Sequence, residues 1–186
     1  MDLIVRSQAG DIRAFEALFH NYKNLVYKTA YLMLGDADEA EDALQEVFLQ
    51  VYKSLPTYQA AKGALTTWLY RMTVNHCLNR RRRQHLAISL DRFSTTPPSE
   101  PSHENQMMEE AAMQHALSRL SDKLRTVVIL RYYWGLSYAE IVQILDIPLG
   151  TVKSRLNQAL GTLRKELEGS QQTSPSLAIS LPCEER

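Results

Sequence analysis

The chain has 186 residues, 45% of them hydrophobic, so it is long enough to bury one medium-sized core or two small ones. Basic and acidic residues number 21 each, and no stretch approaches the roughly 18 uninterrupted apolar residues of a membrane span. Residues 1–10 lack a basic segment followed by an apolar one, so we expect no secretory signal, no membrane insertion and a cytoplasmic location.

The first predicted helix carries apolar residues at the spacing of one buried helical face, from Phe15 through Leu18 and Tyr22 to Val26. Gly35 is expected to end it. Asp36 is a suitable N-cap for a second helix, whose apolar stripe runs to Leu55 and is followed by Pro56. No segment alternates as a strand would, so the sequence predicts an all-α fold.

The second helix is strongly acidic over its first three turns, and its geometry turns Leu49 outward among charged side chains. Acidic residues in the first turn favour the positive end of the helix dipole, but the later ones need another explanation. An exposed leucine ringed by charge fits a basic protein partner. The alternative is a solvated helix face, because single exposed leucines are common.

The third predicted helix, about Ala64 to Gln84, is basic. Residues 61–92 hold 7 basic and 1 acidic side chain, whereas residues 1–60 hold 5 and 9. Arginines at 71 and 80–83 would neutralise phosphates, although cations also stabilise a helix C-terminus. Trp68 and Tyr70 are candidates for stacking on unpaired bases, while the stripe that Trp68 shares with Leu65 favours a core position for it.

Residues 89–105 are rich in Ser, Thr and Pro and read as a flexible linker, so two small helical domains are predicted. The expected division is 1–88, the linker 89–105, a second domain over 106–168, and a disordered tail over 169–186. In the second domain we expect helices at 108–120 and 121–134, with Ser121 as a cap between them.

A helix-turn-helix is predicted near the end of the second domain. An apolar stripe from Tyr138 to Leu145 is interrupted by Asp146, Ile147 and Pro148, and a second stripe begins at Val152. Burying that second stripe points Ser154, Asn157, Gln158 and Gly161 the opposite way, flanked by Lys153 and Arg155. Amides pair with adenine and cations with guanine or phosphate, so this face is suited to reading DNA. The alternative is an ordinary solvated face.

No catalytic, metal or cofactor site is predicted. The five histidines lack the spacing of metal ligands, and the chain has no Gly-rich phosphate loop and no nucleophile elbow. Cys77 and Cys183 lie far apart without a CxxC motif, so both are expected to be free thiols, with a regulatory disulfide as the alternative. We therefore expect a non-enzymatic protein.

Three segments together resemble the extracytoplasmic-function (ECF) sigma factors, which retain only the second and fourth sigma regions. They are DADEAEDALQEVFLQVY (36–52), TTWLYRMTVNHCLNRRRRQ (66–84) and LSYAEIVQILDIPLGTVKSRL (136–156). The resemblance implies a protein of transcription initiation and stress response, with sigma region 2 before the linker and region 4 after it. A stand-alone helix-turn-helix regulator is the alternative, and it would normally dimerise.

The resemblance also implies roles for individual residues. The acidic helix would dock on the β′ clamp helices of RNA polymerase core through Asp42, Gln45, Glu46 and Leu49. The −10 element would be bound by the loop 58–64 and by Trp68, Arg71, Asn75, Asn79, Arg80, Arg81, Arg82 and Arg83. The −35 element would be read by Thr151, Lys153, Ser154, Arg155, Asn157 and Gln158. Arginine is frequent in the family near 157 and 158, so the amides found here leave the −35 preference open.

The partners that the resemblance implies are RNA polymerase core, through the β′ clamp helices and the β flap, and promoter DNA. Many members of the family are held inactive by an anti-sigma protein, which is therefore a third candidate partner. The linker would thread toward the active-site channel of the polymerase.

Overall fold

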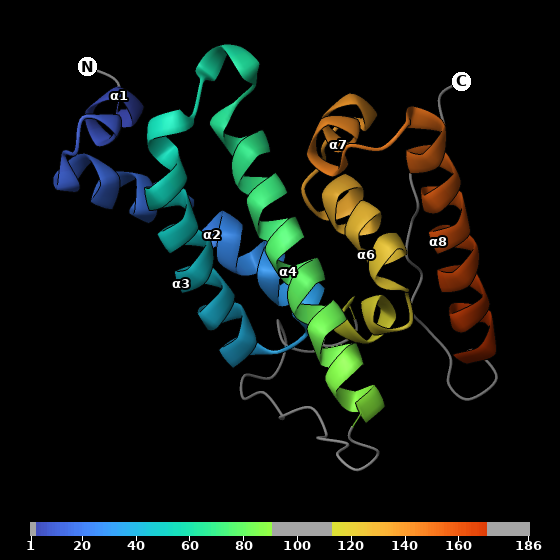
Figure 1. Ribbon diagram of the computed structural model, residues 1–186. Helices are drawn as coiled ribbons and strands as arrows, with labels where there is room; N and C mark the ends of the chain where they lie inside the picture. The colour runs from blue at the N-terminus through green and yellow to red at the C-terminus, as the bar shows by residue number, and fades with distance from the viewer. Residues whose placement is uncertain (1–2, 91–112, 171–186) are drawn as a thin grey trace.

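The computed structural model describes residues 3–90 and 113–170, and every regular element in these two ranges is helical. The elements, in chain order, are α1 (Leu3–Gln8), α2 (Ile12–Leu34), α3 (Ala37–Ser54), the 3-10 turns η1 (Leu55–Thr57) and η2 (Ala60–Lys62), α4 (Leu65–Leu90), α6 (Asp122–Val128), the π-helical turn η3 (Ile129–Tyr133), α7 (Tyr138–Leu145) and α8 (Leu149–Ser170). A further helical turn covers 113–118. The predicted all-α class is confirmed (Figure 1).

The ends of the long N-terminal helices follow from capping residues. Asp11 accepts a hydrogen bond from the Ala14 amide at 3.1 Å and begins α2, and Asp36 accepts one from the Glu39 amide at 2.8 Å and begins α3. Gly35 ends α2 in the left-handed region, with φ of 85°. The predicted boundary between the first two long helices is therefore confirmed at Gly35 and Asp36.

The predicted helix-turn-helix consists of α7 and α8. Ser137 and Glu140 form a reciprocal capping box at the start of α7, and Asp146 ends that helix with φ of 51°. Ser121 occupies the N-cap position of α6, as expected, but its side chain donates or accepts no capping hydrogen bond. The sequence did not predict η3, where five residues adopt π-helical pairing after α6.

Helices α2, α3 and α4 enclose one hydrophobic cluster of their own, with α1 against its edge. Its buried members are Leu18, Val26, Val47, Phe48, Val51, Leu55, Leu65, Leu69 and Met72. None of the helices in the described ranges is long and apolar enough to span a membrane.

A second cluster joins the two parts of the chain. It combines Met33 of α2, Ala43 of α3 and Cys77 of α4 with buried residues of 117–159. Helix α4 packs against α2 and α3 on one side and against α7 on the other. The two predicted domains therefore share a core in this structure, which the sequence did not predict.

Parts of the predicted linker and tail lie outside the described residues. Of the linker, Ser89 and Leu90 belong to α4, so the helix continues six residues beyond the predicted end at Gln84 and two residues into the predicted linker. Of the tail, Gly169 and Ser170 belong to α8. Residues 91–105 and 171–186 lie outside the described ranges, and the domain boundaries remain predictions.

Candidate polymerase and nucleic-acid interfaces

One face of α3 is acidic and solvent-exposed. Asp42, Gln45, Glu46 and Leu49 are all exposed, and the Leu49 side chain retains 60% of its accessible surface. The opposite face buries Val47 and Phe48, so the helix periodicity that predicted an outward Leu49 holds. We call these four exposed residues the acidic face.

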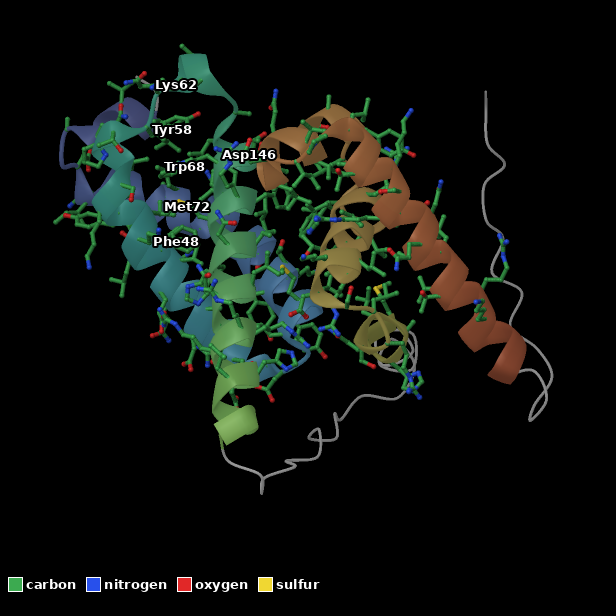
Figure 2. The ribbon with its side chains drawn as sticks, turned by 45° about the vertical axis from the view of Figure 1, so that its right-hand side comes forward. Phe48, Tyr58, Lys62, Trp68, Met72 and Asp146 are labelled. Atoms are coloured by element: carbon green, nitrogen blue, oxygen red, sulfur yellow. The ribbon has the colours of Figure 1, made fainter. Side chains whose placement is uncertain are left out.

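A cavity of about 180 Å³ lies where the loop 55–64 meets the first turns of α4. Tyr58, Lys62, Trp68 and Arg71 contribute to its lining. The centroids of the Tyr58 and Trp68 rings are 5.2 Å apart, and the planes of the two rings are tilted by 43°. Figure 2 shows Tyr58, Trp68 and Lys62 at the same end of the α3–α4 pair, beyond Met72 and Phe48. We call this site the aromatic pocket, and its size and lining suit a flat ring.

Hydrogen bonds hold the loop that forms one wall of the aromatic pocket. The Tyr58 hydroxyl donates to the Gly63 carbonyl at 2.8 Å. The side-chain amide of Gln8 donates to the carbonyls of Leu55 at 3.0 Å and Tyr58 at 2.8 Å. A residue of α1 thus positions a loop some fifty residues later, and no pattern in the sequence pointed to Gln8.

A polar groove of about 340 Å³ continues from the aromatic pocket along α4 toward α3. Arg71 lines both sites, and Asn75, Asn79 and Arg83 are exposed along the groove. His76 and Glu46 both line the groove, with His76 Nε2 3.7 Å from the Glu46 carboxylate. Arg80 also lines it and lies 3.2 Å from the Asp42 carboxylate. The groove is therefore lined both by residues of the basic helix α4 and by Glu46 of the acidic face.

The four consecutive arginines have different surroundings. Arg80 pairs with Asp42, whereas Arg82 and Arg83 are exposed. Arg81 turns toward the second half of the chain, where its Nε lies 2.6 Å from Asp122 Oδ1 and its Nη1 donates to the Met33 carbonyl at 2.9 Å. Positions that the sequence treated as one cluster thus face solvent, α3 and α6.

Tyr70 corrects one expectation about base stacking. Its side chain is 5% exposed, its ring lies 5.5 Å from that of Trp134, and burial raises the pKa of its hydroxyl. Tyr70 faces the opposite way from the aromatic pocket because it is two residues from Trp68, about 200° around the helix. In this structure Tyr70 is a core residue.

Trp68 combines the two roles that the sequence left open. It is half-buried and packs against the cluster that contains Leu65 and Met72, while another part of its ring lines the aromatic pocket. A ring held in this way by the core is fixed in position, so little entropy would be lost if a flat group stacked on it.

Two groups on α4 have shifted pKa values. Burial lowers the pKa of His76, against the opposing effect of Glu46. Burial raises the pKa of the Cys77 thiol to about 12, so the thiol is protonated and shielded in the shared core. Cys77 is a free thiol, as expected, and the other cysteine, Cys183, lies outside the described residues. Within the described ranges, no three His, Cys, Asp or Glu side chains are arranged to hold a metal ion.

The second helix of the helix-turn-helix presents its predicted polar face to solvent. Lys153, Ser154, Asn157 and Gln158 are exposed, and Thr151 and Arg155 are half-exposed. The opposite face is anchored by three buried residues, Val152, Leu156 and Ala159. We call the exposed set the reading face.

Two family models match the chain in the order of these surfaces. A model described as Sigma-70 region 2 covers residues 18–86, and one described as Sigma-70, region 4 covers residues 110–163. The first range holds the acidic face, the aromatic pocket and the groove, and the second holds the helix-turn-helix.

Two RNA polymerase sigma factors are similar to this chain over most of its length. ECF RNA polymerase sigma factor SigW of Bacillus subtilis is 34% identical over 177 residues, covering 88% of this chain and 94% of that protein. RNA polymerase sigma-H factor of Pseudomonas aeruginosa is 32% identical over 184 residues, covering 89% and 92%.

Two solved structures share the fold at lower identity. CnrH, in complex with the cytosolic domain of CnrY, is 20% identical with a TM-score of 0.68, covering 90% of this chain and 96% of CnrH. The sigma factor RpoE from Bartonella quintana, in complex with the anti-sigma factor NepR, is 21% identical with a TM-score of 0.72, covering 84% and 98%.

Proposed function

The chain belongs to the ECF RNA polymerase sigma factors, which direct RNA polymerase to specific promoters, and on that premise we propose which surface contacts each partner. The observation that carries the proposal is the exposure of Ser154, Asn157 and Gln158 on the second helix of a helix-turn-helix whose other face is buried. A stand-alone regulator is not favoured, because the region 2 match covers the first half of the chain.

The acidic face is the proposed docking site for polymerase core, on the β′ clamp helices. Its support is the combination of three polar residues around Leu49, an exposed apolar side chain that would be desolvated on binding. Charge complementarity with a basic partner would add association rate and orientation more than affinity.

The aromatic pocket and the polar groove form the proposed −10 site. An unpaired base would stack against Trp68 beside Tyr58, and its phosphates would pair with Arg71 and the exposed arginines of α4. The remaining proposed contacts are Asn75, Asn79, Arg80, Arg81, Arg82 and Arg83. Asn75 and Asn79 lie on the groove side of α4, which supports their inclusion.

The reading face is the proposed −35 site. Asn157 and Gln158 would contact base edges in the major groove, and Lys153 would contact phosphate. Ser154, Thr151 and Arg155 complete the set. The side chains reach outward from a helix whose register is fixed by Val152 and Leu156, so their positions on DNA would be set by the core.

Further partners belong to the same proposal. We expect the β flap of the polymerase to bind the second domain, the linker 89–105 to follow the polymerase channel, and the protein to act in the cytoplasm without an enzymatic activity of its own. An anti-sigma protein is a proposed regulator, since a structural neighbour is a sigma factor in complex with one. The domain division 1–88 and 106–168 is proposed on the same basis.

Run-off transcription on genomic fragments tests the proposal. Purified protein plus polymerase core should start transcription at a discrete set of promoters, and core alone should not. If no promoter is used under any condition, the proposed contacts fail. A chain that dimerises and binds duplex half-sites without polymerase would favour the stand-alone regulator instead.

A further inference from the structure

We infer that an intramolecular clasp around Arg81, Asp122 and Arg125 holds the free chain closed and thereby restrains the proposed −10 site, while the reading face stays exposed. The inference rests on the proposed function, because it concerns access to the same −10 surface. The evidence for it is that α2 and α4 pack against α6 and α7, although the sequence assigned these two sets of helices to separate domains.

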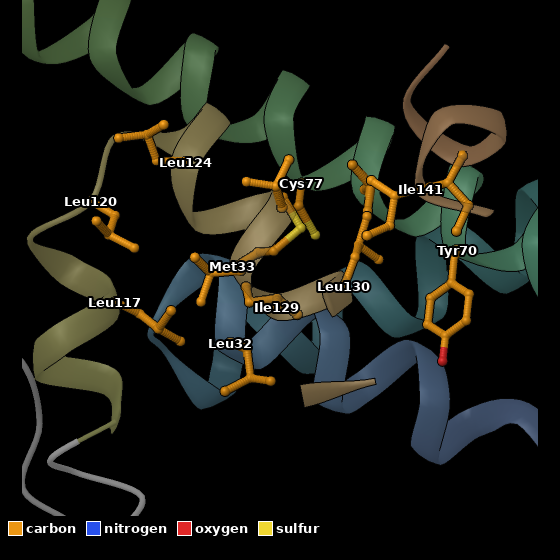
Figure 3. Packing of buried hydrophobic residues seen from close by; sticks show 14 of the residues in the cluster. Leu32, Met33, Tyr70, Cys77, Leu117, Leu120, Leu124, Ile129, Leu130 and Ile141 are labelled. Carbon is orange, nitrogen blue, oxygen red and sulfur yellow. The ribbon is translucent and has the colours of Figure 1, made fainter. Parts of the chain in front are cut away.

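The shared core has α4 at its centre. Figure 3 shows Cys77 of α4 close to Met33 of α2 and to Ile129 of η3. Tyr70 and Cys77 are 5% and 0% exposed, so this side of α4 is covered by the second half of the chain. Apolar burial of this kind supplies the attraction but little directional preference.

Directional contacts converge on the C-terminal end of α2. The Met33 carbonyl accepts hydrogen bonds from Arg81 Nη1 at 2.9 Å and from Arg125 Nη1 at 2.8 Å. One arginine comes from α4 and the other from α6. Asp122, in the first turn of α6, closes the arrangement through its 2.6 Å ion pair with Arg81.

Arg125 ties the clasp to the second half of the chain. Its side chain is 4% exposed and also donates to the Leu117 carbonyl at 2.8 Å. A buried guanidinium needs nearly all its donors satisfied, so in the closed chain Arg125 requires the Met33 carbonyl as a partner. This requirement makes the position of α6 against the end of α2 specific.

A second contact engages the −10 site itself. Arg71, which lines both the aromatic pocket and the polar groove, donates to the Gln143 carbonyl in the last turn of α7. Asp146 caps the same end of α7, and Figure 2 shows it beside α4. The negative end of a helix dipole and a carboxylate at this place compete with phosphate for Arg71.

The closed arrangement cannot serve both promoter elements at once. Elements named −10 and −35 are about 25 base pairs apart, or roughly 85 Å of duplex. A compact body of 186 residues has a radius of gyration of about 16 Å. The α4–α7 contact must therefore break before both proposed DNA sites are occupied, and the clasp sets how often it breaks in the free chain.

Trp134 offers a direct readout of opening. It contacts Tyr70 across the α4 boundary, and the chain has two tryptophans, so Trp68→Phe leaves Trp134 as the sole emitter. In the full-length Trp68→Phe chain, adding Asp122→Arg should shift the emission maximum to the red as Trp134 meets water. Adding Arg81→Asp to that variant should restore the ion pair in reverse and return the emission most of the way to its starting value, because the hydrogen bond from Arg81 to the Met33 carbonyl stays lost.

Two controls separate opening from misfolding and from added charge. Glu41→Arg makes the same change of charge on an exposed position of α3 and should leave Trp134 emission unchanged. The double variant Asp122→Arg, Arg81→Asp carries the same arginine at the start of α6. If its Trp134 emission recovers, the shift in Asp122→Arg is not caused by local unfolding of α6. Circular dichroism checks the helix content of every variant. If folded Asp122→Arg keeps the parent emission, the clasp is overturned.

DNA access is measured in chains that retain Trp68, with a fluorescein-labelled pool of short random single-stranded DNA. Asp122→Arg should bind this pool about tenfold more tightly than the wild type, because the competent state becomes more populated. Glu41→Arg should match the wild type. Opening without tighter binding would overturn the restraint of the −10 site.

Failure of the proposed function would look different. It would appear as normal promoter opening by Arg71→Ala in the presence of core polymerase, and it would leave the emission shift of Asp122→Arg intact. The clasp and the −10 assignment therefore stand or fall on separate measurements.

Discussion

The ring of Trp68 lies 5.2 Å from that of Tyr58, so one residue of α4 and one of the preceding loop together shape the aromatic pocket. Trp68 is anchored by the hydrophobic cluster beneath it, and Tyr58 by its hydroxyl on the Gly63 carbonyl. Both rings are therefore held in place, one by core packing and the other by a hydrogen bond. This pairing determines the first expectation.

Replacing Trp68 should weaken promoter opening. Trp68→Ala removes the stacking surface, which is worth about 1–3 kcal/mol per base, whereas Trp68→Phe retains an aromatic face and should lose less. The measurement is the rate of open-complex formation with core polymerase at a mapped start site. Equal rates for the two variants and the wild type would remove Trp68 from the −10 site.

Leu49→Ala should reduce affinity for polymerase core by about 1–2 kcal/mol without affecting the free energy of unfolding, because Leu49 is exposed in the free protein. Leu86→Ala is the matched control, since Leu86 is also 60% exposed but lies on α4. Competition for core polymerase against a labelled wild-type chain gives both affinities. A similar loss in both variants would argue against a specific anchor.

Asn157→Ala should change the −35 sequence preference, whereas Lys153→Ala should change only the overall affinity for DNA. Loss of the Asn157 amide should cost about 1–3 kcal/mol at one base pair of the −35 element and relax the preference there. Loss of Lys153 should weaken all −35 sequences alike and lower the salt slope by about one. Transcription from a set of −35 variants at two salt concentrations distinguishes them, and identical profiles would contradict the assignment.

The protein should become less stable on acidification because of His76. Burial lowers the pKa of His76 in the folded state, so the unfolded chain binds more protons as the pH falls through the ordinary histidine pKa of about 6.5. The free energy of unfolding should therefore decrease on acidification, by less than about 1.4 kcal/mol per pH unit from this group. Denaturant titrations at several pH values give the free energy of unfolding of the wild type and of His76→Gln. The variant should lose less of this free energy on acidification, and an equal or larger loss would refute the prediction.

Two glycines should respond oppositely to alanine. Gly35 has φ of 85° at the end of α2, so Gly35→Ala should destabilise the protein by about 1 kcal/mol through backbone strain although its Cβ meets no crowding. Gly161 lies within α8 with open space around it, so Gly161→Ala should stabilise by up to about 1 kcal/mol. Chemical denaturation of both variants gives the two signs.

Local signals in the sequence determined most of the helical framework. The side chain of Asp36 accepts a hydrogen bond from the Glu39 amide, and Gly35 and Asp146 act through their own backbone conformation, so these effects do not depend on distant partners. The same holds for the reading face: once Val152 and Leu156 are inward, helical geometry fixes the outward direction of Asn157.

Tertiary structure decided which surfaces meet. An apolar stripe specifies that a face is buried but not against what, so the sequence could not say that α4 packs on α7, that Tyr70 meets Trp134, or that Gln8 holds the loop at Tyr58. The arginine run shows the same division. Its charge was plain from the sequence, but which arginine meets a carboxylate depends on packing. Arg80 meets Asp42 of α3, Arg81 meets Asp122 of α6, and Arg82 faces solvent.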